Sequence, residues 1–301
     1  MVRTTPAPEF DLPSLFPAIA ALARQTVRLH PRPDRDVAVN ASKWGGRLLW
    51  PADEEWPICT EPEWLREGES TPQHEHRYIP MLQLRKGDFP ELSFPGDTDL
   101  FQLLWCPNDH ELTLSVICKV FWRKESDVAG PIAEVPKPTL VEADYLPRPC
   151  RLHPERVTEY PSQGNLPTAL DDAIHDWESE RGIEGPYFYE MSVAPGTKIG
   201  GYVRWIQFEW IPVCECGQAM EHLLTVASDE FGGSWPRWYP LEDVQATGLS
   251  QEQLETDYAY LDALKDADRS SGIMLGDSGS LYLFICHNCP TWPIDWIVQS
   301  C

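Results

Sequence analysis

Four cysteines in the last third of the chain have the spacing of a metal site. Cys214-Glu215-Cys216-Gly217 forms a C-x-C-G motif, and Cys286-His287-Asn288-Cys289 forms a C-x-x-C motif. Two thiolate pairs that face each other give the tetrahedral four-sulfur cage that zinc prefers. We therefore predict a closed, structural zinc site at Cys214, Cys216, Cys286 and Cys289. Two alternatives stay open: the four are reduced structural thiols, or His287 replaces one of the cysteines.

The first half of the chain carries a reduced version of this pattern. Cys59 is followed by Glu61 and Cys106 by Asp109, so carboxylates stand where the second cysteine of each pair would be. A buried free cysteine behaves as a small apolar residue. We interpret Cys59 and Cys106 as buried thiols of a decayed site, although two sulfurs and two carboxylates can also bind zinc. The nearby His74-Glu75-His76 shows no third ligand at a matching position, and we assign no metal to it.

An aromatic segment in the second half offers candidate contacts for a protein partner. The segment Phe231-Gly232-Gly233-Ser234-Trp235-Pro236-Arg237-Trp238-Tyr239 combines glycines with large aromatic side chains. Trp and Tyr are among the residue types that dominate interface energetics. If this segment is an exposed loop, Trp235, Trp238 and Tyr239 are the expected partner-binding residues. The alternative is that the rings are buried against a sheet.

Motifs of common enzyme classes are absent from the sequence. It contains no phosphate-cradling glycine loop followed by lysine, no G-x-S-x-G and no H-E-x-x-H. Asp97 and Asp277 each follow a glycine and precede a hydroxyl residue, a pattern typical of turns. We therefore expect a protein that is not an enzyme.

The elements that position these residues occur twice. Ser42-Lys43-Trp44-Gly45-Gly46 matches Thr197-Lys198-Ile199-Gly200-Gly201, and the same separation of 155 positions relates Cys59 to Cys214. A later Gly-Asp block also occurs in both halves, now 180 positions apart, so the second repeat contains an insertion. Repetition in constant register indicates one duplicated unit.

We predict an α+β, β-rich fold, in which an internally duplicated β unit is covered by a few helices. The expected segments are an N-terminal helical segment (1–35), a first β-rich repeat (36–124), a linker with a helix (125–189) and a second β-rich repeat with the zinc site (190–301). Apolar residues at helical spacing predict helices over 15–29, 166–181 and 250–267, and alternation predicts a strand over 111–122. The helices are expected to pack on the sheets.

Composition narrows the classes of partner. A net charge of −23 disfavours nucleic acid and anionic membranes and favours a protein with a basic surface. Nine cysteines, with C-x-C and C-x-x-C spacing, favour metal ligation over a disulfide framework. The N-terminus lacks a basic segment followed by an apolar core, and no apolar run approaches about 18 residues, so we expect a cytoplasmic protein.

Several blocks resemble the YwqG-like bacterial family, a domain of unknown function. Over about residues 36–301, the matching blocks are Ser42-Lys43-x-Gly45-Gly46, Trp56-Pro57, Leu82-Gln83-Leu84, Lys198-Ile199-Gly200-Gly201 and Gly276-Asp277-Ser278-Gly279-x-Leu281-Tyr282-x-Phe284. The second repeat is also similar to programmed cell death protein 2, in which a Lys-x-Gly-Gly-x-x-x-Trp block precedes Cys-x-x-Cys-Gly and a strand rich in methionine and leucine. Here Cys214 departs from that pattern, because one residue instead of two separates it from Cys216.

The resemblance implies a duplicated β-rich fold and a binding role. The bacterial relatives look like members of toxin–immunity neighbourhoods, and the eukaryotic relative resembles a chaperone for a ribosomal protein. We expect an immunity protein that neutralises a cognate bacterial toxin by direct binding, with a basic toxin domain as partner. The alternatives are a chaperone-like binder of a basic ribosomal or nucleic-acid-binding client, and an uncharacterised enzyme.

Overall fold

Two antiparallel sheets dominate the computed structural model, which describes residues 2–62, 76–110, 116–139, 141–183, 185–232, 236–250, 253 and 259–301. Both have six strands, in the orders β10-β1-β11-β12-β13-β14 and β2-β9-β3-β6-β7-β8. The predicted α+β, β-rich class is confirmed.

The strand bounds are as follows. The sheet of the second repeat contains β10 (Glu155–Glu159), β1 (Arg24–Arg28), β11 (Lys198–Gly200), β12 (Glu221–Ala227), β13 (Ser280–Ile285) and β14 (Ile294–Gln299). The sheet of the first repeat contains β2 (Arg32–Pro33), β9 (Cys150–Arg151), β3 (Lys43–Trp44), β6 (Ile79–Arg85), β7 (Leu100–Trp105) and β8 (Cys118–Arg123). A separate short ribbon pairs β4 (Ile58–Cys59) with β5 (His76–Arg77).

Four strands of each sheet follow the same path along the chain. The order β3-β6-β7-β8 in the first sheet corresponds to β11-β12-β13-β14 in the second. The repeated glycines also share their backbone conformation, with φ of +59° and +70° at Gly45 and Gly46 and of +66° and +71° at Gly200 and Gly201. Glycine adopts positive φ at little steric cost, whereas other residues rarely do. Strand order and turn geometry therefore agree with a duplication.

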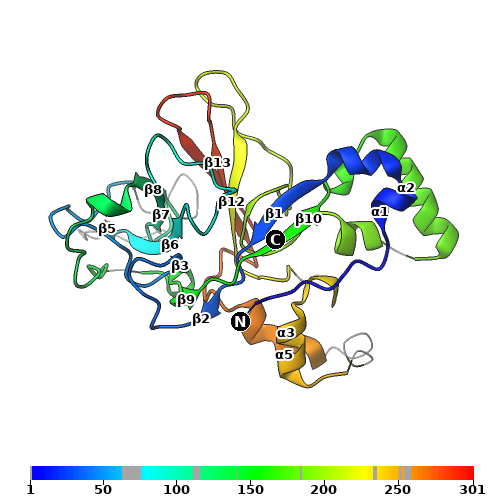
Figure 1. The fold of residues 1–301 in the computed structure, drawn as a ribbon, viewed down its shortest axis with the longest axis horizontal. Helices are drawn as coiled ribbons and strands as arrows, with labels where there is room; N and C mark the ends of the chain where they lie inside the picture. Colours follow the sequence, from blue (N-terminus) through cyan, green and yellow to red (C-terminus); the bar gives the residue numbers. More distant parts are fainter. Residues whose placement is uncertain are drawn as a thin grey trace, which may run out of the picture.

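The two remaining strands of each sheet come from segments that cross between the repeats. Strand β1 continues into β2, and β9 continues into β10; β1 pairs with β10, and β2 pairs with β9. Strand β1, which precedes the first repeat, pairs with β11 of the second, whereas β9, which precedes the second repeat, pairs with β3 of the first. Figure 1 shows β1 and β10 running side by side toward β2 and β9. The repeats therefore exchange strands, and residues 125–189 are more than a linker.

The central strands are apolar on both faces because clusters of side chains cover both. One core lies between the sheets and includes Leu103 of β7 and Leu283 of β13. The outer faces carry two further apolar clusters. One includes Leu104 of β7, and the other includes Phe284 of β13. Strands buried on both faces have continuous rather than alternating apolar sequences, as β7 does.

The predicted helix over 15–29 is wrong in its second half. A short helix α1 (Leu12–Leu15) and a 3-10 helix η1 (Pro17–Leu22) come first, and β1 begins at Arg24. Thr26 and Val27 are β-branched and buried, and they pair with both β10 and β11. Branched side chains suit a strand better than a helix, and here the tertiary pairing overrides the helical spacing.

The second predicted helix is confirmed as α2 (Thr168–Arg181). Its buried residues include Leu170, Ile174 and Trp177, and Gly182 ends it in the left-handed conformation with φ of +64°. Its apolar face packs on α1 and η1 in a separate cluster, not on a sheet as expected. Figure 1 shows α1 and α2 together at the far end of β1 and β10.

The last predicted helix and the strand over 111–122 are described in part. Helix α5 (Ala259–Asp268) lies beside α3 (Leu241–Thr247), and its Leu264 is buried. Strand β8 covers the end of the predicted strand; residues 111–115, 251–252 and 254–258 lie outside the described residues. Within the described part of the chain, no helix combines the length and apolar character needed to cross a membrane.

Candidate metal centre

The C-x-C-G motif lies in a tight turn just before β12. The N–H of Gly217 donates to the carbonyl of Cys214 (2.8 Å), and the N–H of Cys214 donates to the carbonyl of Gln218 (2.9 Å). Gly217 has a φ of +83°, in the region that favours glycine. The glycine after the second cysteine therefore has a structural reason: it lets the chain reverse and bring the two thiols of the pair together.

The C-x-x-C motif lies in the loop between β13 and β14. The N–H of Cys286 donates to the carbonyl of Pro293 (3.1 Å), and the N–H of Trp292 donates to the carbonyl of Cys289 (3.0 Å). In the antiparallel pair of β12 and β13, Glu221 lies opposite Ile285. The start of β12 and the end of β13 therefore meet at one end of the sheet, and this pairing brings the two cysteine turns together.

The four cysteine sulfurs form a cluster of the size of a metal site, which we call the four-cysteine centre. All four Sγ atoms lie within 4.8 Å of one another, with 3.6 Å between Cys214 and Cys289 and 3.6 Å between Cys216 and Cys286. Sulfurs in a tetrahedral zinc site are about 3.8 Å apart, because each Zn–S bond is about 2.3 Å. The predicted residues thus come together in an arrangement that can hold a metal ion such as zinc.

His287 is not part of the four-cysteine centre. Its Nδ1 lies 3.3 Å from Glu221 Oε2, and its ring packs edge-on against Trp292 with 4.6 Å between the centroids. The open alternative in which His287 replaces a cysteine does not fit, because all four cysteines already converge.

Hydrogen bonds favour a thiolate at Cys216. The N–H of Gln218, followed by the neighbouring thiols, lowers the pKa of Cys216 to about 7. Hydrogen bonding to Cys216 and then to Cys214 raises the pKa of Cys289 to about 12, because one thiol must keep the shared proton. A metal ion binds thiolates and displaces such protons, so metal binding at this cluster would release protons.

The predicted partner-binding aromatic residues do not form a surface. Trp238 and Tyr239 are buried, at 1% and 2% exposure, and Trp235 lies outside the described residues. The Trp238 indole donates to the carbonyl of Tyr189 (3.1 Å), and the guanidinium of Arg28 lies 5.4 Å from its ring centroid. Expecting these two rings at the surface is therefore wrong: strand exchange brings Arg28 of β1 over Trp238.

An exposed apolar segment, which the sequence interpretation missed, lies immediately before the first cysteine turn. We call residues 206–213 the apolar segment; its exposed side chains are those of Phe208, Trp210, Ile211 and Val213. Phe208, Trp210 and Val213 are each about 60% exposed or more (60%, 59% and 66%). Large contiguous apolar patches on a protein surface commonly mark interaction sites. The signal available in the sequence was the series of large apolar residues immediately before C-x-C-G.

Both ends of the apolar segment are fixed by hydrogen bonds. The N–H groups of Ile206 and Gln207 both donate to Gln299 Oε1 (3.1 Å each), and Gln299 donates to the carbonyl of Phe208 (2.7 Å). At the other end, the N–H of Met220 donates to the carbonyl of Pro212 (2.9 Å). The segment is thus attached to β14 on one side and to the cysteine turn on the other.

In the first repeat, the two carboxylates do not join the cysteines. The hydroxyl of Tyr145 donates to Asp109 Oδ1 (2.5 Å), and Glu61 is exposed. A site of two sulfurs and two carboxylates is therefore not formed. His74 and Glu75 lie outside the described residues, whereas His76 belongs to β5.

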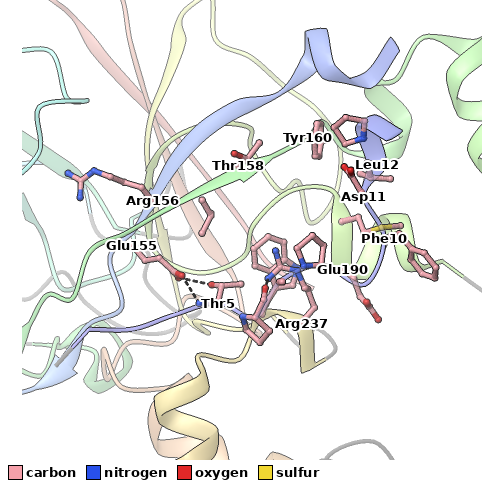
Figure 2. Close-up of a pocket in the computed structure, with 17 residues that line it drawn as sticks. Thr5, Phe10, Asp11, Leu12, Glu155, Arg156, Thr158, Tyr160, Glu190 and Arg237 are labelled. Atoms are coloured by element: carbon pink, nitrogen blue, oxygen red, sulfur yellow. Dashed lines mark hydrogen bonds between the residues drawn. The ribbon is translucent and has the colours of Figure 1, made fainter. Parts of the chain in front are cut away.

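A cavity of about 390 Å³ lies between the N-terminal residues and β10 (Figure 2). Thr5 donates its N–H and its hydroxyl to Glu155 (2.5 and 2.6 Å), and Arg237 donates to the carbonyl of Pro6. His30 Nε2 also lies 3.0 Å from Glu155 Oε2. These contacts hold the N-terminal segment on β10.

Comparisons of the chain with known protein families and with curated proteins find no match. The resemblance to the YwqG-like family and to programmed cell death protein 2 therefore stays a prediction. The candidate sites are interpreted from their own geometry.

Proposed function

We propose that the protein is a non-enzymatic binding protein, that the four-cysteine centre holds one structural zinc ion, and that the apolar segment is the partner-binding surface. The observation that carries this proposal is the position of the exposed Phe208, Trp210 and Val213 directly beside Cys214. The same cysteine turn that would bind zinc also fixes the end of the segment.

The ligand set supports a structural rather than a catalytic metal. Catalytic zinc sites keep an open position for water or substrate, whereas four cysteines close the coordination sphere. Binding of structural zinc contributes on the order of 10 kcal/mol of apparent free energy, which becomes folding free energy when the site forms only in the folded chain. Zinc here would keep the apolar segment preorganised, and a preorganised surface loses less entropy on binding.

Charge supports a basic protein as the partner. The chain has 47 acidic and 24 basic residues, and the apolar segment itself carries the exposed Glu209, with exposed Glu215 in the adjoining turn. Complementary charge accelerates association, while buried aromatic anchors supply most of the affinity. We propose a bacterial toxin domain with a basic surface as this partner, met in the cytoplasm, where free thiols stay reduced.

Co-expression with a toxin encoded by an adjacent gene tests this function. We expect a stoichiometric complex and protection that saturates at one protein per toxin. Trp210→Ala should accelerate dissociation on the order of 30-fold, because truncating an interface hot spot costs about 2 kcal/mol or more. Leu241→Ala, at another exposed apolar residue on α3, is the matched control and should leave dissociation unchanged.

Two outcomes would contradict the proposal. Protection at substoichiometric amounts, with the damage chemically reversed, would indicate an enzyme. Absence of protection, together with co-purification of a basic ribosomal or nucleic-acid-binding client, would favour the chaperone-like alternative.

A further inference from the structure

The first repeat contains a second cluster of metal-binding side chains. Cys59, Cys106 and His110 offer ligand atoms that all lie within 4.8 Å of one another. The Sγ of Cys59 lies 3.8 Å from Nε2 of His110. All three residues are buried, with exposures of 3%, 0% and 1%. A thiolate sulfur and an imidazole nitrogen on one tetrahedral zinc ion are about 3.5 Å apart, so the cluster has nearly the size that one ion requires.

This cluster occupies the place in the first repeat that the four-cysteine centre occupies in the second. Cys106 directly follows β7, as Cys286 directly follows β13. The N–H of Cys106 donates across to the carbonyl of Ile117 (2.9 Å), just as the N–H of Cys286 donates to that of Pro293 (3.1 Å). Cys59 and Cys106 belong to the apolar cluster on the outer face of the first sheet, and Cys214 and Cys286 belong to the corresponding cluster of the second.

The ligand lost from the C-x-x-C pattern is replaced one position later along the chain. Asp109 stands where Cys289 stands in the second repeat, but it bonds to Tyr145 instead. The next residue, His110, turns toward Cys59. The sequence interpretation missed His110 because it compared residues at equal spacing. The residue that corresponds to Cys289 in function here is a histidine and lies one position later.

The orientation of His110 is that of a metal-binding imidazole. Its Nδ1 lies 3.0 Å from the carbonyl of Pro62, which can only accept, so Nδ1 carries the proton. Nε2 therefore presents its lone pair to the sulfur side of the ring. Metal-ligating histidines almost always donate their second N–H to a carbonyl or carboxylate in this way, which fixes the tautomer and the ring.

Two further side chains border the cluster. The Nδ2 of Asn108 donates toward the sulfur of Cys106 (3.8 Å) and lies 3.3 Å from Nδ1 of His76. His76 is also the cross-strand partner of Cys59 in the β4–β5 ribbon. Asn108 therefore contacts the cluster directly, and His76 borders it through Asn108 and through the strand pairing with Cys59.

We propose that Cys59, Cys106 and His110 form a second zinc site, with three protein ligands and a fourth position taken by water or another small donor. Two sulfurs and one imidazole suit zinc better than magnesium or calcium, which prefer oxygen ligands. The site is independent of the proposed binding function, and it differs from the four-cysteine centre in keeping one position that the protein does not close.

Native mass spectrometry of the full-length protein, purified without chelators under reducing conditions, tests the site. The expected content is two zinc ions per chain, falling to one in His110→Ala. Cys150→Ala is the matched control, because Cys150 is buried but lies in neither cluster. It should retain two ions. A zinc content that is the same in His110→Ala as in the wild type would overturn the proposal.

Cobalt substitution keeps the test decisive if His110→Ala does not fold. His110→Cys replaces the imidazole by a third thiolate, and it should retain two metal ions. The sulfur-to-cobalt charge-transfer absorption should rise in proportion to one additional thiolate. An unchanged spectrum in a folded His110→Cys protein would show that residue 110 does not contact the metal, and would contradict the proposed ligand set.

Discussion

The two cysteine clusters lie at equivalent ends of equivalent strands, yet they differ in composition and in depth. In the second repeat, Cys216 is exposed and Cys289 is partly exposed. In the first, Cys59, Cys106 and His110 are all buried. The four thiols that can complete a coordination sphere alone therefore reach the surface at Cys216 and Cys289, whereas Cys214 and Cys286 are buried. The three-ligand cluster belongs instead to the interior of its repeat.

The two repeats also differ in the charges that surround their repeated lysine. Lys198 Nζ lies 2.7 Å from Glu159 Oε2, and both side chains are buried. Lys43 instead donates to the carbonyl of Ala38 (2.7 Å), and burial, followed by the charge of Arg47, lowers its pKa to about 8. The difference arises from strand exchange: β10 brings a carboxylate to the second repeat, and β2 brings none to the first.

Removal of the metal from the four-cysteine centre should have the largest effect. Cys216→Ser with Cys289→Ser should abolish zinc binding there and forfeit binding free energy on the order of 10 kcal/mol. We expect rapid amide exchange across residues 206–220 and 286–293, while β6 and β7 of the first repeat stay protected. Hydrogen exchange followed by mass spectrometry measures this. Unchanged protection in the second repeat would mean that no metal supports it.

Breaking the buried ion pair should come next. Glu159→Ala leaves Lys198 buried without its carboxylate, and we expect a loss of about 3–5 kcal/mol in the free energy of unfolding. Lys43→Met, at the lysine of the first repeat that corresponds to Lys198, should cost no more than about 1–2 kcal/mol, because it removes a hydrogen bond to a carbonyl and no charge pair. Urea denaturation of both variants provides the comparison, and equal losses would contradict it.

Burial of Glu230 should make stability depend on pH. Burial raises the pKa of Glu230 to about 7, above its ordinary 4.5, although a hydrogen bond from Thr197 and the charges of Arg32 and Arg28 act in the opposite direction. Between these two values the folded state binds more protons, so the contribution of Glu230 to stability falls as pH rises from 4.5 to 7. Glu230→Gln, which cannot ionise, should therefore gain on the order of 2 kcal/mol relative to wild type at about pH 8.

The same variant should show little advantage at about pH 4, where Glu230 is largely protonated in both the folded and the unfolded state. Thermal unfolding of variant and wild type across this range separates Glu230 from other titrating groups. A difference that does not vary with pH would show that the carboxyl is ionised normally in the folded protein.

Substitutions in the apolar segment should have the smallest effect on folding. Phe208→Ser changes a side chain that is 60% exposed, and exposed substitutions usually alter stability by no more than about 0.5 kcal/mol. Denaturation midpoints for Phe208→Ser and wild type should coincide within that margin. A loss of several kcal/mol would show that this ring is part of the core and not a free contact surface.

The shared strand order of the two halves and the convergence of the four cysteines could be predicted from sequence because both leave local signals. Cys214 and Cys216 stand beside a glycine that forms their turn, and constant spacing relates the two Gly-Gly blocks. Helix α2 is equally visible, since its apolar spacing and its terminal Gly182 agree with each other. Such features depend on residues that are near one another in the chain.

Features that depend on distant pairings could not be predicted. Residues 24–28 have helical spacing, and only pairing with β10 and β11 makes them a strand. Trp238 is buried, and the guanidinium of Arg28 from the distant strand β1 lies over its ring. His110 contacts Cys59 from a position in its loop one residue later than the position of Cys289 in the second repeat. Each of these features depends on contacts between segments that are far apart in the sequence, and no local pattern predicts such contacts.

X-ray diffraction from crystals of the full-length protein, recorded on both sides of the zinc absorption edge, tests the account most directly. We predict a strong anomalous peak about 2.3 Å from the sulfurs of Cys214, Cys216, Cys286 and Cys289. A second peak should lie between Cys59, Cys106 and His110. A map of chelator-free, reduced protein that shows no peak among the four sulfurs, or disulfides in their place, would contradict the metal-supported architecture proposed for the second repeat.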